Sequence, residues 1–417
     1  MNLCDEQQAA LAGITECVNR GVPLVSLSGP AGSGKTSIIS ELCAGLHDVE
    51  VCTPTNKAAQ VLRNKGLQAN TFYRTFYTLE EPEPGKRTNL RFIPNRLLYA
   101  GNHDSKMPPG KRTDCSVLII DEASMVTRRM VDQMMEMCDT LVLIGDEHQL
   151  PPVGDGIGYF CSRKHDFTLT KIWRQKDNGI ILDLAREVRK GGAKVNNLLE
   201  QHFNPDGSYA EWVRSGACSI AFTNKERRRL NFVARRILGF NSPLPAAGDR
   251  MVVANNFSED LLNGTPVQVE SFTWDAVSPV ARIGLLYDVG DGPVRTEYTM
   301  DMEAFHDDQI ASAQDKFSTF RRKRDDEYPP DSLLNIQFGY CITAHKAQGS
   351  EWDRVVVFDQ RGLIYHMANK GAATAGDGGL SPDESVRRWL YTAITRARHE
   401  LAVMPCWWGK TEQPLAA

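Results

Sequence analysis

Gly29-Pro30-Ala31-Gly32-Ser33-Gly34-Lys35-Thr36 is the stretch that decides the fold of this 417-residue chain. An apolar run over residues 24–27 precedes it, and residues 37–46 have the character of a helix. Strand, glycine-rich loop and helix thus stand in the order of a phosphate-binding loop, in which backbone N–H groups and a helix N-terminus surround an anion. The octet predicts a nucleoside triphosphate site in an α/β fold, and its context makes a plain glycine-rich turn with a surface lysine the weaker explanation.

The residues of this loop have separate expected roles. The glycines let the backbone wrap the phosphates, Lys35 would reach the β- and γ-phosphates, and the Thr36 hydroxyl would hold Mg²⁺. Upstream, the amide of Gln7 could hydrogen-bond an adenine edge, or the residue could simply lie solvated at a helix start; the residues alone leave both open. The residues of the loop expected to bind ATP are Gly29, Gly32, Ser33, Gly34, Lys35 and Thr36.

Composition excludes several classes of protein. With 41% hydrophobic and 24% charged residues and a formal net charge of −4, the chain is an ordinary globular sequence, and any nucleic-acid site must be a local basic groove. Ten cysteines without a C-x-x-C pair indicate reduced thiols in a cytosol-like compartment and no zinc site. No apolar stretch approaches the roughly 20 residues that span a bilayer, and no secretory signal opens the chain. We therefore expect a cytoplasmic protein with no membrane contact.

Further polar residues follow apolar strands. The strand over 115–120 ends in Asp121, which is expected to bind the metal, and Glu122, which is expected to orient and deprotonate the attacking water. After the next strand, Gln149 could contact the γ-phosphate. Arg174 could clamp the same phosphate, or form a surface ion pair. These residues predict a hydrolytic site.

Two clusters suggest contacts with a nucleic acid. A short strand over 49–52 leads into residues 53–59, whose hydroxyls, amide and lysine could grip phosphates, although Thr55 could equally serve as a helix cap. Aromatic residues interleaved with an arginine over 71–77 could stack on bases or pack in the core.

The middle of the chain changes pattern twice. Residues 80–113 are turn-rich around a strand-like stretch at 90–99, which predicts an inserted β-hairpin. A strand at 218–222 begins a second α/β unit, and the next helix carries a run of basic residues over 225–236 that we expect to form a solvated face. Short β segments over 248–334 then predict a small β-barrel whose polar tail covers 301–331.

The α/β pattern resumes near the end of the chain. Residues 381–384 read as a capping box, and the helix they start is expected to continue through residue 398. It would carry Arg396 and Arg398, which are candidates for an arginine finger, or routine cations at a helix C-terminus.

Taken together, these motifs resemble the motor motifs of superfamily 1 helicases, and most closely those of the RecD/Dda branch. The resemblance covers nearly the whole chain except the hairpin insertion and the polar arm. Its most specific parts are residues 343–351 and 391–398. The matching segments are Gln7 and residues 29–36, 53–59, 121–124, 145–153, 173–175, 221–224, 263–267, 343–351 and 391–398.

The resemblance implies two RecA-like P-loop motor domains with two insertions. The first motor domain would comprise residues 1–79 and 114–175, and the second residues 176–247 and 335–417. The insertion at 80–113 would be a strand-separating pin, with Phe92 and Tyr99 as candidate wedge residues. Residues 248–334 would be an accessory barrel like a Src-homology-3 domain, with its polar arm.

It also implies the activity of an ATP- and Mg²⁺-dependent DNA helicase that travels 5′→3′ on single-stranded DNA. Catalysis would use Lys35, Glu122, Gln149, Arg174 and Arg396, and Glu351 would help to bind ATP. The expected partners are single-stranded and forked DNA, and single-strand-binding, replication or recombination proteins; we expect a monomer. The DNA-contacting residues would be Pro54, Thr55, Asn56, Thr71, Tyr73, Thr343, His345 and Lys346.

Three alternatives remain beside this reading. A single-strand translocase that displaces bound proteins would share every motor residue, and a strand-displacement assay would separate it. A regulatory ATPase subunit of a recombination or replication complex would need partners in order to unwind DNA. A small-molecule kinase would share the phosphate loop but would leave residues 343–351 and 391–398 without a purpose.

Overall fold

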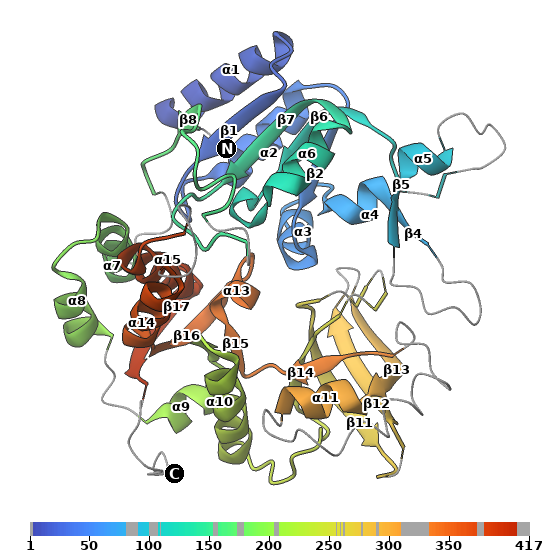
Figure 1. The fold of residues 1–417 in the computed structure, drawn as a ribbon, viewed down its shortest axis with the longest axis vertical. Coiled ribbons are helices and arrows are strands. Elements are labelled where there is room, and N and C mark those ends of the chain that lie inside the picture. The colour runs from blue at the N-terminus through green and yellow to red at the C-terminus, as the bar shows by residue number, and fades with distance from the viewer. Residues whose placement is uncertain are drawn as a thin grey trace. The chain divides into compact units, whose positions relative to one another are not determined.

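The chain folds into two compact units, one of residues 1–179 with 364–392 and the other of residues 180–363 with 393–417. Each unit contains a parallel sheet (Figure 1). The computed structural model describes residues 3–80, 91–99, 107–108, 110–152, 157–172, 179–203, 208–255, 257–258, 260–261, 263–276, 278–288, 292–309, 333–372 and 379–406.

The first unit is built on a six-stranded sheet in which every neighbouring pair is parallel. The phosphate loop follows β1, and the predicted Asp121 and Glu122 follow β6. Because β6, β7 and β1 are neighbours, the segments after these three strands gather at one edge of the sheet. In spatial order the strands are β3 (Asn70–Thr71), β2 (Val49–Thr53), β6 (Cys115–Ile120), β7 (Cys138–Gly145), β1 (Leu24–Ser28) and β8 (Phe167–Thr168).

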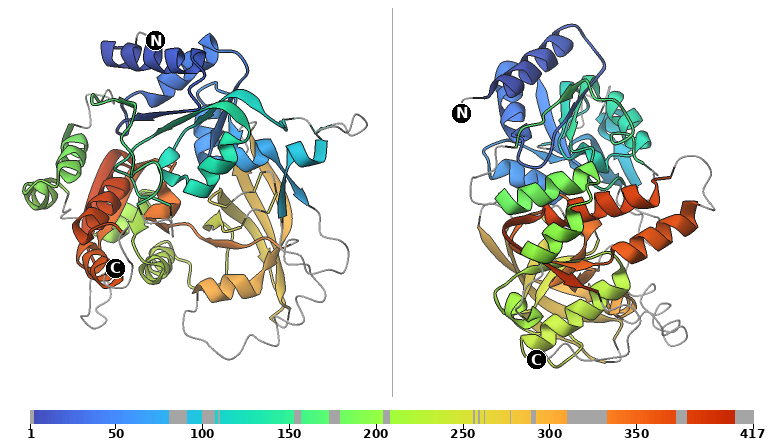
Figure 2. Two further views of the ribbon diagram at one scale, coloured as in Figure 1. Left: turned by 45° about the horizontal axis from the view of Figure 1, so that its top comes forward. Right: turned by 90° about the vertical axis from the view of Figure 1, so that its left-hand side faces the viewer.

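Helices bury both faces of this sheet, which explains why its strands are continuously apolar. Val117 and Ile119 of β6 pack in the cluster that contains α1, α2 and α3, while Leu118 and Ile120 pack with α4 and α6. These helices are α1 (Asp5–Asn19), α2 (Lys35–Gly45), α3 (Asn56–Arg63), α4 (Phe72–Phe76) and α6 (Arg128–Met135), with a 3₁₀ turn, η1 (Ala123–Met125), after β6. The first of them, α1, can be followed from the N-terminus in Figure 2.

An antiparallel pair forms at the 80–113 insertion, but it begins before it: β4 (Tyr77–Glu80) starts three residues ahead of the predicted boundary and pairs with β5 (Arg91–Pro94). The strand expected over 90–99 stops at Pro94, however, because Asn95–Tyr99 form helix α5. The amide of Asn95 is fully buried and donates to the carbonyls of Thr75 and Arg112, both at 2.9 Å. The Asn95 side chain thus fixes the turn that ends the strand. The hydrophobic alternation of the sequence does not reveal these contacts.

Helix α15 (Pro382–Ile394) starts at the predicted cap, since the Glu384 N–H donates to Ser381 Oγ at 3.2 Å. It ends at Ile394, four residues before the predicted end, and β17 (Ala397–Pro405) follows. Arg396 therefore lies in the short connection, and Arg398 lies on a strand. Another helix, α14 (Arg361–Ala372), precedes α15.

The second unit contains a four-stranded parallel sheet in the order β15 (Cys341–Thr343), β9 (Cys218–Ala221), β16 (Trp352–Asp359) and β17. Apolar residues of α9 and α10 share a core with one face of this sheet. Its helices are α7 (Gly179–Lys190), α8 (Val195–His202), α9 (Tyr209–Arg214), α10 (Asn224–Ile237) and α13 (Ala344–Ala347).

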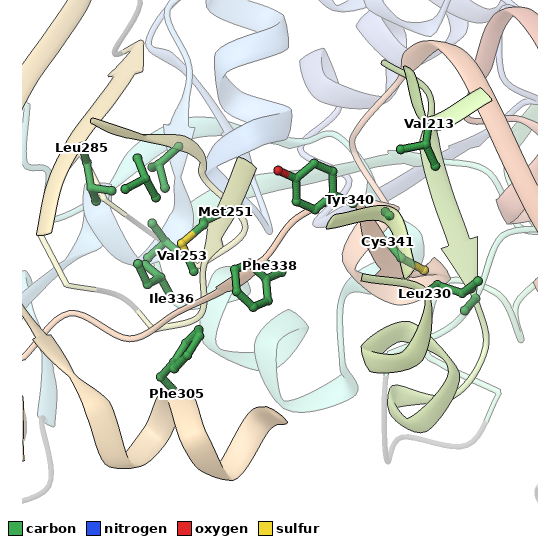
Figure 3. Packing of buried hydrophobic residues seen from close by; sticks show 14 of the residues in the cluster. Val213, Leu230, Met251, Val253, Leu285, Phe305, Ile336, Phe338, Tyr340 and Cys341 are labelled. Carbon is green, nitrogen blue, oxygen red and sulfur yellow. The ribbon is translucent and has the colours of Figure 1, made fainter. Parts of the chain in front are cut away.

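The β insertion of this unit is a five-stranded antiparallel sheet in the order β13, β12, β11, β10 and β14. Four of its strands match the predicted segments, and β14 (Ile336–Phe338) lies just beyond the expected end of the insertion. In Figure 3, Phe305 of α11 (Met302–Gln309) faces Phe338, with ring centroids 5.4 Å apart. The other strands are β10 (Arg250–Val253), β11 (Pro266–Thr273), β12 (Val280–Asp288) and β13 (Pro293–Asp301).

A buried ion pair ties this insertion to α10. Arg235 donates from Nε and Nη2 to the two carboxylate oxygens of Asp249, both at 2.9 Å, and Tyr340 Oη donates to Asp249 at 2.9 Å. Asp249 precedes the first strand of the insertion and Tyr340 follows the last, so one carboxylate joins both connections to α10. Arg227 on the same helix is buried as well, against Asp308. The expectation of a solvated basic face is therefore wrong for Arg227 and Arg235.

All ten cysteines have free thiols. In the described part of the chain, no helix is both long enough and apolar enough to cross a bilayer.

Candidate nucleotide and nucleic-acid sites

The phosphate loop has the strained backbone that its glycines allow. Gly32 and Gly34 have φ of +79° and +86°, and Gly34 is the cap from which α2 starts. The N–H groups of Ser37 and Ile38 donate to the Gly34 carbonyl, at 3.0 and 3.3 Å. Ser33 Oγ is buried and has no hydrogen-bond partner among the described residues. The loop thus keeps polar groups available at the start of a helix, which suits an anion.

Lys35 and Gln7 both contact the main chain of this loop. Lys35 Nζ donates to the carbonyls of Gly29 (2.8 Å) and Pro30 (3.1 Å), so its ammonium lies over the loop. Gln7 is 7% exposed; its Nε2 donates to the Ser33 carbonyl at 2.9 Å and its Oε1 accepts from the Cys4 N–H at 3.0 Å. A Cβ at Gly34 would lie 2.1 Å from Gln7 Nε2. Gln7 therefore braces the phosphate loop, and is not a solvated residue at a helix start.

The carboxylates after β6 lie close to the lysine of the loop. Burial raises the pKa of the Asp121 carboxyl, and the charges of Lys35 and Lys65 act in the opposite direction. Glu122 has φ +56° and ψ +39°, a conformation that costs a non-glycine residue roughly 1 kcal/mol or more and is typical of functional sites. Its N–H donates to Asp121 Oδ1 at 2.9 Å.

Thr36 and Asp121 supply a hydroxyl and a carboxylate, hard oxygen donors of the kind that Mg²⁺ prefers. Thr36 Oγ1 already accepts from a cation, since Lys65 Nζ donates to it at 3.3 Å. The charge of the same lysine also acts on Asp121. An ammonium thus lies beside both oxygen donors, and Mg²⁺ would take its place there.

The loop after β7 carries Gln149, which is 2% exposed and whose Oε1 has no hydrogen-bond partner among the described residues. The loop is closed on itself, because the His148 N–H donates to Asp146 Oδ1 (3.1 Å) and the Gln149 N–H to the Asp146 carbonyl (3.2 Å).

Helix α15 of the same unit holds this loop through residues to which we assigned no role from the sequence. Tyr391 Oη donates to Asp146 Oδ2 at 2.6 Å, Thr392 Oγ1 accepts from the Leu150 N–H at 3.0 Å, and Arg388 donates to the carbonyls of Glu147 and Gln149. Tyr391 and Thr392 lie inside a recognised motif. Arg388 stands just outside it, and its partners are about 240 residues away in sequence.

The polar residues after β2 and β3 begin short helices. Thr55 Oγ1 accepts from the Ala58 N–H and Thr71 Oγ1 from the Arg74 N–H, each at 3.3 Å, so both are helix caps. Asn56 Oδ1 is buried without a hydrogen-bond partner among the described residues. Tyr73 is half-buried beside Phe72 and Tyr77, and its hydroxyl donates to Gln133 at 3.4 Å. Pro54 lies at the same strand end, also half-buried.

The second unit repeats this arrangement after β15. Thr343 Oγ1 accepts from the Lys346 N–H at 3.5 Å, again as a cap. Burial lowers the pKa of the Lys346 ammonium, the nearby Arg227 lowers it further, and Lys346 Nζ donates to Gln337 at 2.8 Å. Burial also lowers the pKa of the His345 imidazole. A partly buried cation at a strand end is a suitable group for binding phosphate.

The remaining predicted residues are dispersed. In the second unit Arg396 is buried, donating from Nη1 to the Ser350 carbonyl (3.2 Å), and Glu351 accepts from Arg398 Nε at 3.4 Å. Arg174 lies outside the described residues, as do its neighbours Trp173 and Gln175. The side chain of the candidate wedge Phe92 is not described, and Tyr99 is half-buried at the end of α5.

Comparison with known proteins finds relatives that are ATP-dependent DNA helicases. Residues 2–204 match the model of a family described as an AAA domain. The chain is 26% identical over 414 residues to the ATP-dependent RecD2 DNA helicase of Deinococcus radiodurans, covering 95% of this chain and 48% of that protein. It is 23% identical over 464 residues to the ATP-dependent DNA helicase dda of Enterobacteria phage T4, covering 96% and 98%. The chain therefore spans about half the length of the first relative and nearly all of the second.

Among solved structures, one from a study of DNA unwinding at forked double-stranded DNA by two coordinating Pif1 helicases matches with a TM-score of 0.57. The match covers 96% of this chain and 92% of that chain at 20% identity. At this identity the likeness concerns the fold, and it fits an α/β architecture with two parallel sheets.

Proposed function

We propose that the chain is a superfamily 1 helicase of the RecD/Dda branch, the family that its motifs resemble, and that it hydrolyses ATP to travel 5′→3′ along single-stranded DNA and to separate duplex DNA. One observation carries the proposal. Three neighbouring parallel strands, β1, β7 and β6, end in the phosphate loop, the Gln149 loop and the Asp121–Glu122 pair. The proposed phosphate cradle, γ-phosphate contact and water-activating base would thus meet at one sheet edge.

The chain's own residues would divide the work of hydrolysis. Lys35 would move from the loop carbonyls to the β- and γ-phosphates, and Gln149 would contact the γ-phosphate. Glu122, whose backbone has a positive φ, would hold and deprotonate the attacking water. Thr36 and Asp121 would hold Mg²⁺, which when bound neutralises charge on the phosphates. Gln7 would position the loop and, through its remaining amide hydrogen, could still meet a base edge.

Arg396, Arg174 and Glu351 complete the proposed ATP site. Arg396 would act as an arginine finger, Arg174 as a second γ-phosphate clamp, and Glu351 as a further nucleotide contact. We infer that nucleotide binding and release alternate the grip of the two motor domains on DNA, which gives directional stepping. The domain boundaries are those proposed from the sequence, with residues 80–113 as a pin and 248–334 as a Src-homology-3-like barrel, except that residues 364–392, expected in the second motor domain, pack in the first compact unit.

The DNA contacts would come from the strand-end clusters of both units. In each, a threonine caps a short helix after a parallel strand, so that main-chain N–H groups and neighbouring polar side chains are available to phosphates. Half-buried Tyr73 would stack on a base. We propose single-stranded and forked DNA as the substrates, a monomer as the active form, and single-strand-binding, replication or recombination proteins as partners. The contacts are Pro54, Thr55, Asn56, Thr71, Tyr73, Thr343, His345 and Lys346.

The experiment that tests this function removes the finger. Arg396→Ala should lower DNA-stimulated ATP hydrolysis by about 10³- to 10⁵-fold, because the finger stabilises charge that develops in the transition state. Binding of single-stranded DNA should survive. Arg20→Ala, which removes an exposed arginine paired with Glu16 on α1, is the matched control and should leave both unchanged. Normal turnover in Arg396→Ala would refute the assignment.

A further inference from the structure

The γ-phosphate loop is held by one face of one helix. Arg388, Tyr391 and Thr392 are spaced i, i+3 and i+4, so they project from the same side of α15. All three are buried, at 7%, 2% and 0% exposure. Their partners lie in five consecutive loop residues, 146–150. Residues 364–392, which include these three, pack in the same unit as the loop.

Each contact fixes a different part of the loop. Tyr391 holds the Asp146 carboxylate at 2.6 Å, and the other oxygen of that carboxylate accepts from the His148 N–H at 3.1 Å. Thr392 holds the Leu150 N–H at 3.0 Å. Arg388 Nη1 donates to the carbonyl of Glu147 and, at 3.1 Å, to that of Gln149. The main chain on both sides of the Gln149 side chain is therefore tied to the helix.

The charge of Arg388 is balanced within the helix itself. Its Nε and Nη2 donate to Glu384 Oε1 at 2.9 and 2.7 Å, one turn earlier. A buried arginine is costly unless it is paired and hydrogen-bonded, and Glu384 meets that need without using any loop atom. The two N–H groups of Nη1 are therefore left for the loop carbonyls of Glu147 and Gln149, so one planar guanidinium joins Glu384 to both carbonyls.

We propose that Arg388, Tyr391 and Thr392 are positioning residues that hold Gln149 in place for the γ-phosphate. This rests on the proposed function, since it deepens the role of the ATP site. The same helix leads to Arg396 four residues after Thr392, so the residues that hold the Gln149 loop and the proposed finger belong to one continuous segment. Gln149 is buried, and its Oε1 lacks a hydrogen-bond partner among the described residues, so its aim depends on the main chain that α15 fixes.

The predicted consequence is a selective loss of γ-phosphate recognition. A displacement of about 1 Å at a catalytic contact can cost on the order of 10²-fold in rate. ADP lacks the γ-phosphate, and its binding depends on the phosphate loop. The contacts of Arg388, Tyr391 and Thr392 described above are with the Gln149 loop. A purely structural role for α15 would instead weaken ADP and ATP alike.

The test measures the binding of ADP and of a β,γ-imido ATP analogue to the full chain by fluorescence anisotropy. Gln149→Ala measures how much the Gln149 side chain contributes to analogue affinity, and we expect it to lower that affinity by about 10- to 100-fold. Tyr391→Phe removes one oxygen, and Arg388→Lys retains the charge but loses the planar fork that joins Glu384 to the two loop carbonyls. Both should reduce analogue affinity toward the Gln149→Ala value, while ADP affinity changes by less than about twofold. Arg387→Ala, on the same helix, should change neither.

Double variants decide whether the three α15 residues act through Gln149. If it does, Gln149→Ala combined with Tyr391→Phe should bind the analogue no more weakly than Gln149→Ala alone. Losses that multiply, equal losses for ADP and the analogue, or a Gln149→Ala variant with full analogue affinity would each overturn the proposal. Wild-type protein that binds nucleotide selectively but does not hydrolyse it would instead refute the proposed function, so the two failures are distinguishable.

Discussion

Replacing Asp249 by asparagine should loosen the β insertion without touching the nucleotide site. The Asp249 carboxylate is fully buried and accepts four hydrogen bonds: two from Arg235, one from Tyr340 Oη and one from the Ala246 N–H at 2.8 Å. An asparagine has the same shape, but its NH₂ group is itself a donor. It would face groups that now donate to the carboxylate, so those hydrogen bonds would be lost. It would also leave the Arg235 charge, 1% exposed, without a carboxylate.

The size of the effect follows from this burial. Removing one partner of a buried, hydrogen-bonded ion pair typically costs about 3–5 kcal/mol, whereas exposed pairs contribute little because water screens them. The guanidinium also lies 4.1 Å from the Phe338 ring and donates to the carbonyls of Ser242 and Leu244, and these contacts persist. We therefore expect about 3 kcal/mol, a large part of a typical domain's stability.

Amide hydrogen exchange measures this locally. Exchange in β10, β11 and β14 should speed up by roughly two orders of magnitude, as about 3 kcal/mol requires, while β1, β6 and β7 of the first unit keep their protection. Tyr340→Phe removes a single hydroxyl and should cost only about 1 kcal/mol. If Asp249→Asn were no more damaging than Tyr340→Phe, the carboxylate would not be the anchor, and the reasoning would fail.

Three further variants test individual roles. Glu122→Gln should bind ATP normally but lower turnover by about 10²- to 10⁴-fold, because the amide cannot accept a proton from water; weakened nucleotide binding would instead indicate a structural role. Burial lowers the pKa of His345 below the value of about 6.5 in an unfolded chain, so the neutral form is favoured by folding and stability is lost as pH falls below about 6.5. Urea midpoints of the wild type should thus fall between pH 7 and pH 5 more than those of His345→Gln, and equal slopes would contradict this. Thr55→Asp keeps a helix cap but brings negative charge to the proposed phosphate contact, so anisotropy should show weaker single-strand binding than in Thr55→Ser, and equal affinities would exclude the contact.

The sequence predicted those parts of the fold that depend on local pattern. The octet at 29–36, the buried strands before Asp121 and Gln149, and the four short strands of the insertion all recur at nearly the expected bounds. These signals are short-range, since hydrophobic periodicity and turn residues act within about ten positions.

What the sequence missed depends on partners far along the chain. Arg235 looked like a solvated cation because nothing nearby in sequence announces Asp249 as a buried partner, and Asn95 ended a strand through carbonyls 17 and 20 residues away. Gln7 had two open readings until its contact with the Ser33 carbonyl placed it against the phosphate loop. Arg388 gave no signal, because its role comes entirely from the loop that folds against it.

The central claim is that this chain couples ATP hydrolysis to strand separation. The most direct test is strand displacement by the isolated protein on matched DNA forks with either a 5′ or a 3′ single-stranded tail. The account predicts release of the displaced strand from the 5′-tailed substrate only, and only with ATP. Vigorous DNA-stimulated ATP hydrolysis without release from either substrate would contradict it and would favour a translocase.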